Sequence, residues 1–177
     1  MRIAITGSHG VWKSTLLDLL NNKKELELFK KIPEVAREEI LKRGKTPDLM
    51  TLEEVIDFEQ TLLNKQIELE QWCSKFISDR SVLDIIVYSE FLLGSHPIKT
   101  KLKEFVKKYF DENKPYDKIF YIPIEFELNK DWIRFEDLQF QKTVDEKFLD
   151  FFNEFNIEPI LLKGTPEQRL NTILQHI

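Results

Sequence analysis

Residues 2–15 read Arg-Ile-Ala-Ile-Thr-Gly-Ser-His-Gly-Val-Trp-Lys-Ser-Thr, and this stretch decides the fold. A short apolar run, Ile3-Ala4-Ile5, is followed by a match to the pattern Gly-x-x-x-x-Gly-Lys-[Ser/Thr] at every position but one. Trp12 stands where the second glycine belongs. In such a loop, consecutive backbone N–H groups wrap phosphates, and the positive end of the following helix adds to the field. The sequence therefore predicts a phosphate-binding loop between a buried strand and a helix.

Each residue type in this loop has a chemical role. Lys13 is expected to reach the β- and γ-phosphates of a nucleotide, and Ser14 to place its hydroxyl on Mg²⁺. Gly7 and Gly10 supply backbone conformations or close approaches that a Cβ would block. The alternative is an ordinary strand–turn–helix without a ligand. The nucleotide-binding residues that we expect are Gly7, Ser8, His9, Gly10, Val11, Trp12, Lys13, Ser14 and Thr15.

Trp12 leaves two interpretations open. A glycine at this position serves a backbone geometry that costs other residues about 1–3 kcal/mol. Either the indole remodels the loop and weakens or abolishes nucleotide binding, or the ring turns outward and a distorted loop still binds. We expect Trp12 to lower nucleotide affinity rather than to prevent folding.

Composition limits the function classes. The chain of 177 residues is predicted to form one domain over residues 1–177, with a full core. Its net charge of −5 argues against a general nucleic-acid binder. The single cysteine, Cys73, excludes an internal disulfide and fits a reducing cytoplasm. With no apolar run of membrane-spanning length, we expect no signal peptide, no membrane anchor and a cytoplasmic location.

Strand-like apolar runs alternate with helical patterns along the chain, which is typical of a parallel sheet covered by helices. We predict an α/β fold of three layers, with about five parallel strands and helices on both faces. The predicted strands are 2–6, 27–32, 75–78, 118–122 and 158–162. The predicted helices are 13–21, 35–43, 52–72, 82–92, 99–111, 137–155 and 166–176.

Asp79 and Arg80 follow the third predicted strand, at the edge where open α/β sheets bind their ligands. Asp79 at that edge would hold Mg²⁺ together with Ser14, and Arg80 would contact a phosphate or the substrate. The alternative is a helix N-cap at Ser81, which Asp84 would complete without any further role.

Glu34 follows the second predicted strand, and Arg37 lies one turn into the next helix. A carboxylate there is placed to accept the proton of a substrate hydroxyl, as a general base in phosphoryl transfer. The alternative is an acid that stabilises the helix dipole. In the third helix, Gln60 interrupts an apolar stripe, and we expect it to be paired in the core or, preferably, to face a cleft.

Arg134 belongs to Asp131-Trp132-Ile133-Arg134, which follows the fourth predicted strand. An arginine on a helical lid that crosses the phosphate site would stabilise the transferring phosphoryl group. The alternative is a surface arginine in a loop. If the lid closes over Lys13, we expect Trp132 to approach Trp12.

Taken together, these motifs resemble the P-loop nucleoside and nucleotide kinases, and most of all the domains related to ribosylnicotinamide kinase, with deoxynucleoside kinases more distant. The resemblance also rests on Pro33–Glu38, Phe58-Glu59-Gln60 and Ser78–Ser81 and extends over nearly the whole chain. It implies ATP or GTP with Mg²⁺ as cofactors. It further implies that Glu34 is the base and that Gln60 reads a nucleobase. The domains most similar in pattern normally have glycine at the positions of Trp12 and Trp132.

The leading hypothesis is a kinase that transfers the γ-phosphoryl group to a nucleoside- or nucleotide-like acceptor. Its catalytic residues would be Lys13, Glu34, Asp79 and Arg134, and its substrate-binding residues Glu34, Arg37, Gln60 and Arg80. Two alternatives stay open: a degenerate P-loop module with a binding or regulatory role, and a simple NTPase. The expected partners are the nucleotide, the acceptor and a second copy of the chain in a homodimer, with neither nucleic acid nor membrane.

Overall fold

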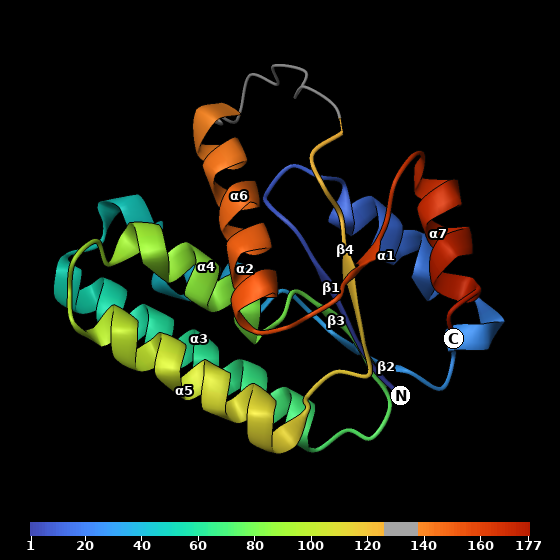
Figure 1. Ribbon diagram of the computed structural model, residues 1–177, viewed down its shortest axis with the longest axis horizontal. Coiled ribbons are helices and arrows are strands. Elements are labelled where there is room, and N and C mark those ends of the chain that lie inside the picture. Colours follow the sequence, from blue (N-terminus) through green and yellow to red (C-terminus); the bar gives the residue numbers. More distant parts are fainter. Residues whose placement is uncertain (126–137) are drawn as a thin grey trace.

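The computed structural model describes residues 1–125 and 138–177, apart from the side chains of Ser14 and Leu138. Within these residues, five parallel strands form one sheet in the order β2-β3-β1-β4-β5 (Figure 1). The predicted α/β fold and the five-stranded sheet are thus confirmed. The strands are β1 (Arg2–Thr6), β2 (Lys30–Ile32), β3 (Phe76–Asp79), β4 (Lys118–Tyr121) and β5 (Ile160–Leu161).

Helices cover both faces of the sheet, as predicted. In Figure 1, α1 and α7 lie on one side and α3, α4, α5 and α6 on the other. None of the helices in the described part of the chain is both long and apolar enough to cross a bilayer. The helices are α1 (Lys13–Asn21), α2 (Val35–Arg43), α3 (Leu52–Gln71), α4 (Val82–Leu92), α5 (Ile98–Asn113), α6 (Leu138–Glu154) and α7 (Pro166–Leu174), with short 3₁₀ turns at Lys24–Leu26 and Pro47–Leu49.

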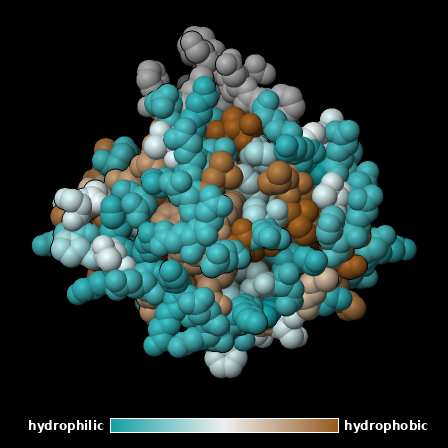
Figure 2. All heavy atoms as spheres, in the orientation of Figure 1, coloured by the Kyte–Doolittle hydropathy of each residue, from teal (hydrophilic) through white to brown (hydrophobic). Residues whose placement is uncertain are grey.

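The alternation of side chains along β1 builds two cores. Ile3 and Ile5 share a core with Leu16 of α1 and Ile173 of α7, whereas Ala4 belongs to the larger cluster formed with α3 to α6. Successive residues of a strand point to opposite faces, so one apolar strand can serve both layers. Figure 2 shows hydrophobic residues at the surface of the face that is in view. Leu161 of the edge strand β5 is half-exposed.

The second and fifth strands are much shorter than predicted, and the fourth ends one residue earlier, at Tyr121. The prediction of a strand over 27–32 is wrong for residues 27–29, where the chain turns and the N–H of Phe29 donates to the carbonyl oxygen of Leu26. Only Lys30–Ile32 pair with β3. The fifth strand is likewise limited to Ile160–Leu161. Since β1 lies beside β3 and β3 beside β2, the carboxyl ends of these three strands meet at one edge of the sheet.

Candidate functional site

The predicted phosphate loop connects β1 to α1, and its backbone needs three left-handed or glycine-like residues. Gly7 has φ +145°, and a Cβ on it would lie 2.6 Å from the carbonyl oxygen of Ile122. Gly10 has φ 74°. Trp12, the N-cap of α1, has φ 69° and ψ 29°, and its side chain forms no capping hydrogen bond. The residue is 59% exposed. The loop thus keeps the left-handed conformation that glycine adopts easily, with an indole that lies largely in solvent.

Lys13 is buried inside this loop. Its Nζ donates to the carbonyl oxygens of Gly7, at 2.8 Å, and Ser8. Burial is the main cause that lowers the pKa of Lys13 to about 7, and the nearby guanidinium of Arg80 lowers it further. The acids Asp84, Asp79 and Glu34 oppose this shift. A bound polyphosphate would favour the protonated amine, so we expect proton uptake on nucleotide binding near neutral pH.

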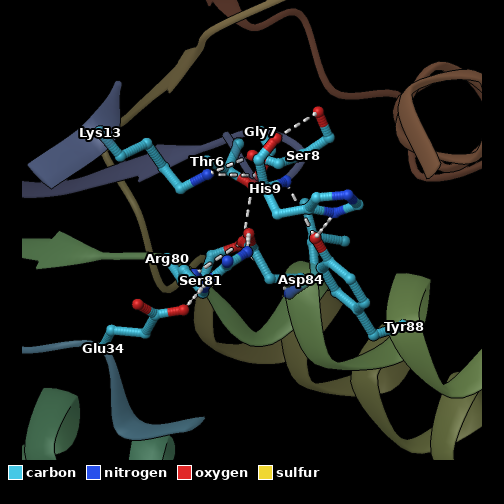
Figure 3. Close-up of polar contacts among 11 residues, drawn as sticks. Thr6, Gly7, Ser8, His9, Lys13, Glu34, Arg80, Ser81, Asp84 and Tyr88 are labelled. Carbon is cyan, nitrogen blue, oxygen red and sulfur yellow. Dashed lines mark hydrogen bonds and ion pairs between the residues drawn. The ribbon is translucent and has the colours of Figure 1, made fainter. Parts of the chain in front are cut away.

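Arg80 connects the acid that follows β2 to the start of α4 (Figure 3). Its Nε donates to Glu34 Oε1 at 2.6 Å and its Nη1 to Asp84 Oδ1 at 3.1 Å. Arg80 has φ 78°, a left-handed conformation that is costly for a residue with a Cβ and typical of functional sites. The guanidinium also lies over the ring of Tyr88, 5.3 Å from its centroid. Several independent contacts therefore fix this cation beside the loop.

Glu34 is the N-cap residue of α2, but its side chain makes no capping hydrogen bond. Its carboxylate instead pairs with Arg80 and lies 3.8 Å from Arg37 Nε. Burial alone would raise the pKa of Glu34, but Arg80, Lys13 and Arg37 outweigh it and hold that pKa below its usual value. Glu34 is thus ionised at neutral pH and faces the site rather than its own helix terminus.

Asp84 has a larger role than the helix cap that the sequence indicated. The capping box with Ser81 is present. In addition, Asp84 Oδ2 accepts a hydrogen bond of 2.6 Å from Thr6 Oγ1, so the buried carboxylate joins the ends of β1 and α4. The Ser81-x-x-Asp84 spacing was the available signal for the cap, whereas no local pattern indicates the contacts of Asp84 with Thr6 and Arg80.

Asp79 ends β3 directly beside β1, where it pairs in register with Ile5. Its Oδ1 is buried and has no hydrogen-bond partner among the described side chains and backbone. Burial, followed by the negative charge of Glu34, raises the pKa of Asp79 to about 6. A buried carboxylate oxygen without a donor fits a magnesium ligand at this edge of the sheet. The side chain of Ser14, the other expected ligand, lies outside the described part of the chain.

Contacts from α4 and α6 hold the first half of the phosphate loop, and the sequence did not reveal them. The N–H of His9 donates to the Tyr88 hydroxyl at 3.1 Å (Figure 3). The His9 ring stacks on Phe140, with centroids 5.5 Å apart. Gln141 Nε2 donates to the carbonyl oxygen of His9 at 2.8 Å. Phe140 and Gln141, near the start of α6, are therefore coupled to the loop.

Arg169 of α7 supports the second half of the loop. Its Nη1 donates to the carbonyl oxygen of Val11 at 2.8 Å, and its Nη2 to Glu125 Oε2 at 3.0 Å. Arg169 is almost fully buried. It thus ties the residue before Trp12 to the segment that follows β4.

Not every predicted residue joins this cluster. Lys13, Glu34, Asp79 and Arg80 come together, with Arg37 at the exposed margin. Gln60 is exposed, and the buried polar residue of that helical turn is its neighbour Glu59. The expected place of Gln60 within the apolar stripe is therefore wrong. Arg134 and Trp132 lie outside the described residues.

A family model described as an AAA domain matches residues 2–169. No curated protein matches the chain in sequence. Among solved structures, the NadR protein in complex with NAD and AMP-PNP aligns with 98% of this chain at a TM-score of 0.73 and 17% identity. NadR in complex with NR gives a TM-score of 0.76, also at 17% identity. This chain covers 48% and 50% of those two NadR chains, about half their length.

Two kinases have similar folds over their own lengths. Deoxyadenosine kinase from M. mycoides with bound dATP aligns over 99% of this chain and 98% of its own, at a TM-score of 0.62 and 14% identity. Thymidylate kinase from Candida albicans aligns over 99% and 89%, at a TM-score of 0.62 and 20% identity. These likenesses show the fold and confirm the resemblance to P-loop kinases. With the family match over residues 2–169, the chain belongs to the AAA domain family and has a P-loop kinase-like fold.

Proposed function

We propose that this protein binds ATP or GTP with Mg²⁺ and transfers the γ-phosphoryl group to the hydroxyl of a nucleoside- or nucleotide-like acceptor. The observation that carries the proposal is the meeting of Lys13, inside the phosphate loop, with Glu34, Asp79 and Arg80 at the carboxyl edge of the sheet. Phosphoryl transfer uses three kinds of group: a cation that binds the phosphates, an acid that binds the metal and an acid that binds the acceptor hydroxyl.

The chain's own residues would divide the work as follows. Lys13, released from the carbonyl oxygens of Gly7 and Ser8, would pair with the β- and γ-phosphates. Asp79, whose buried Oδ1 has no partner in the described part of the chain, would hold Mg²⁺ together with Ser14. When bound, Mg²⁺ supplies charge neutralisation to the phosphate oxygens.

Glu34 would orient the acceptor hydroxyl and accept its proton. The carboxylate is ionised because Arg80 and Arg37 lower its pKa, which also makes it a weak base. A weak base suffices because the transition state of phosphoryl transfer is loose and needs little activation of the nucleophile. Arg80, held by Glu34 and Asp84, would keep the carboxylate in place and face the transferring group. Arg134 retains the role that the resemblance implies, as a proposal, whereas the exposed Gln60 is not assigned to the acceptor site.

The test is nucleotide consumption with and without a panel of nucleosides and nucleoside monophosphates. We expect acceptor-dependent turnover, and Glu34→Gln should lower it by about 10²-fold, the lower end of the usual contribution of a general acid–base group, because a loose transition state needs little activation of the nucleophile. The dissociation constant for Mg·ATP should change little. Glu68→Gln, on the exposed face of α3, is the matched control and should behave like the wild type.

Two outcomes would contradict the proposed transfer. Turnover that is the same with and without every acceptor would indicate hydrolysis, with water as the acceptor. Absence of any Mg·ATP binding would indicate a degenerate module. Equal activity in Glu34→Gln and wild type would remove Glu34 from the mechanism.

A further inference from the structure

A cavity of about 530 Å³ lies between α1, α2 and the β2–β3 side of the sheet. Glu34 and Asp79 line it, so the cavity adjoins the proposed phosphoryl-transfer site. Its walls are partly apolar, with Leu17 on α1 and Leu41 on α2. Lys31 of β2 also lines it. Space of this size is sufficient for a small-molecule acceptor.

Lys31 lies on the face of the sheet that carries α1. In the β2–β3 ladder it pairs in register with Ile77, which packs in the core formed with α1. Asp79 is two residues beyond Ile77 and therefore shares this face. The structure thus places a lysine on the floor of the cavity, on the same face as the carboxylate that we assign to magnesium.

The Nζ of Lys31 is buried and forms no hydrogen bond with any residue that the structure describes. Four acids line the same cavity, namely Asp18, Glu34, Glu38 and Asp79, but none of them forms an ion pair with Lys31 in the described structure. Glu34 is already paired with Arg80. Burial lowers the pKa of Lys31. A buried ammonium without a partner is costly and is retained where a ligand or a function requires it.

An anion is the ligand that would complete this arrangement. Arg37 lines the same cavity and is largely exposed, with only a 3.8 Å contact to Glu34, so it can contribute a second positive charge at the mouth. Of the acids in the cavity, Glu34 would bind the acceptor hydroxyl and Asp79 would bind the metal. A ligand with a hydroxyl at one end and an anionic group at the other would satisfy both sets of residues.

We propose that Lys31 binds an anionic group of the acceptor, a phosphate or a carboxylate, so that the acceptor is a charged alcohol rather than a neutral nucleoside. This inference rests on the proposed function, because it assigns the cavity to the acceptor. Lys31 is then a specificity-determining residue that acts at a distance from the reacting hydroxyl.

The test titrates the full chain with inorganic phosphate and, separately, with acetate, followed by NMR chemical shifts. Saturating Mg·AMP-PNP occupies the phosphate loop during the titration. We expect wild type to bind one of the two anions, which tells phosphate from carboxylate recognition. Lys31→Met should weaken that binding by about ten- to a hundredfold, the worth of one charge-assisted hydrogen bond. Lys31→Arg should retain it.

The matched control is Lys30→Met, which removes an exposed lysine from the same strand and should bind the anion like wild type. Thermal unfolding provides a second readout, because replacing an unpaired buried ammonium with methionine should leave the midpoint unchanged or raise it. The proposal is overturned if Lys31→Met binds both anions as wild type does, or if wild type binds neither in the millimolar range. Failure of Mg·AMP-PNP to bind would instead overturn the proposed function, and the anion titration without nucleotide would still test Lys31.

Discussion

Replacing Trp12 with glycine and with alanine separates the cost of its backbone conformation from the contribution of its indole. Both variants remove the ring, but only glycine adopts φ 69° without a penalty. A residue with a Cβ pays about 1–2 kcal/mol in the left-handed region. Glycine in turn loses more backbone entropy on folding, by about 0.4–1 kcal/mol relative to alanine. We therefore expect Trp12→Gly to be more stable than Trp12→Ala by roughly 0.8 kcal/mol, within a range of about 0–1.6 kcal/mol.

The assay is urea denaturation of the two variants at one pH. Glu68→Gly and Glu68→Ala, on the exposed face of α3, form the control pair and should show the opposite order, with glycine less stable by about 1 kcal/mol. The reasoning is refuted if Trp12→Ala is more stable than Trp12→Gly by a margin like that of the control pair.

The same pair of variants decides where the strain acts. The sequence suggested that a glycine would tighten nucleotide binding, because strain would be relieved in the bound loop. In the structure, the left-handed conformation of Trp12 is part of the folded chain, so its cost falls on folding. We expect the two variants to bind Mg·ATP within about twofold of each other. If Trp12→Gly binds Mg·ATP about fivefold or more tightly than Trp12→Ala does, a difference of roughly 1 kcal/mol, the strain affects nucleotide binding rather than folding.

Three further predictions concern buried ionisable side chains. Asp79→Asn should lower the magnesium-dependent gain in ATP affinity by about tenfold or more. Titrations with ATP in Mg²⁺ and in EDTA measure this gain, and an equal loss of ATP affinity under both conditions would contradict the assignment of Asp79 as a metal ligand. Arg169→Met should weaken Mg·ATP binding by about tenfold, because the carbonyl oxygen of Val11 loses its donor, and Arg169→Lys should recover part of the loss in the same titration. Burial raises the pKa of Glu59 from 4.5 to about 8, so the folded state holds this proton more tightly than the unfolded state. The stabilising contribution of Glu59 is therefore fully present below pH 4.5 and is lost as the pH rises towards 8, so the wild type should lose stability relative to Glu59→Gln over this range. Denaturation of both proteins at several pH values measures the difference, and parallel pH profiles would contradict a buried, protonated Glu59.

The parts of the fold that the sequence predicted are those encoded by local patterns. The bounds of α1, α2 and α4 agree with the expected ranges 13–21, 35–43 and 82–92. Each of these helices begins directly after a strand and its loop, so the change of periodicity marks its first residue. The placement of Asp79 at the carboxyl edge followed from the parallel sheet, because that edge is shared by all its strands.

The buried polar residues of α3 could not be predicted in this way. A stripe of apolar residues led to Gln60, whereas the structure buries Glu59, Gln66 and Glu70. Gln66 Nε2 donates to Glu70 at 2.6 Å and to Ser78 Oγ at 2.8 Å, so a partner from β3 satisfies a polar group on the buried face. Apolar periodicity assigns polar residues to solvent, and it has no information about partners that are distant in sequence.

The same limit applies around the phosphate loop. Its motif predicted the strand, the turn and Lys13, because these residues are consecutive. The groups that hold the loop come from α4, α6 and α7, through Tyr88, Gln141 and Arg169. Only the folded chain brings these helices together.

Calorimetric titration of wild type and Lys13→Met with Mg·ATP tests the central claim most directly. Methionine keeps much of the aliphatic stem that is buried in the loop and removes the charge, and thermal unfolding verifies that the variant is folded. The account predicts that wild type binds Mg·ATP and that Lys13→Met binds it about ten- to a hundredfold more weakly, as expected for the loss of a charge-assisted contact with phosphate. Equal affinity in the two proteins, or no binding by the wild type, would contradict the assignment of residues 7–15 as a working nucleotide site.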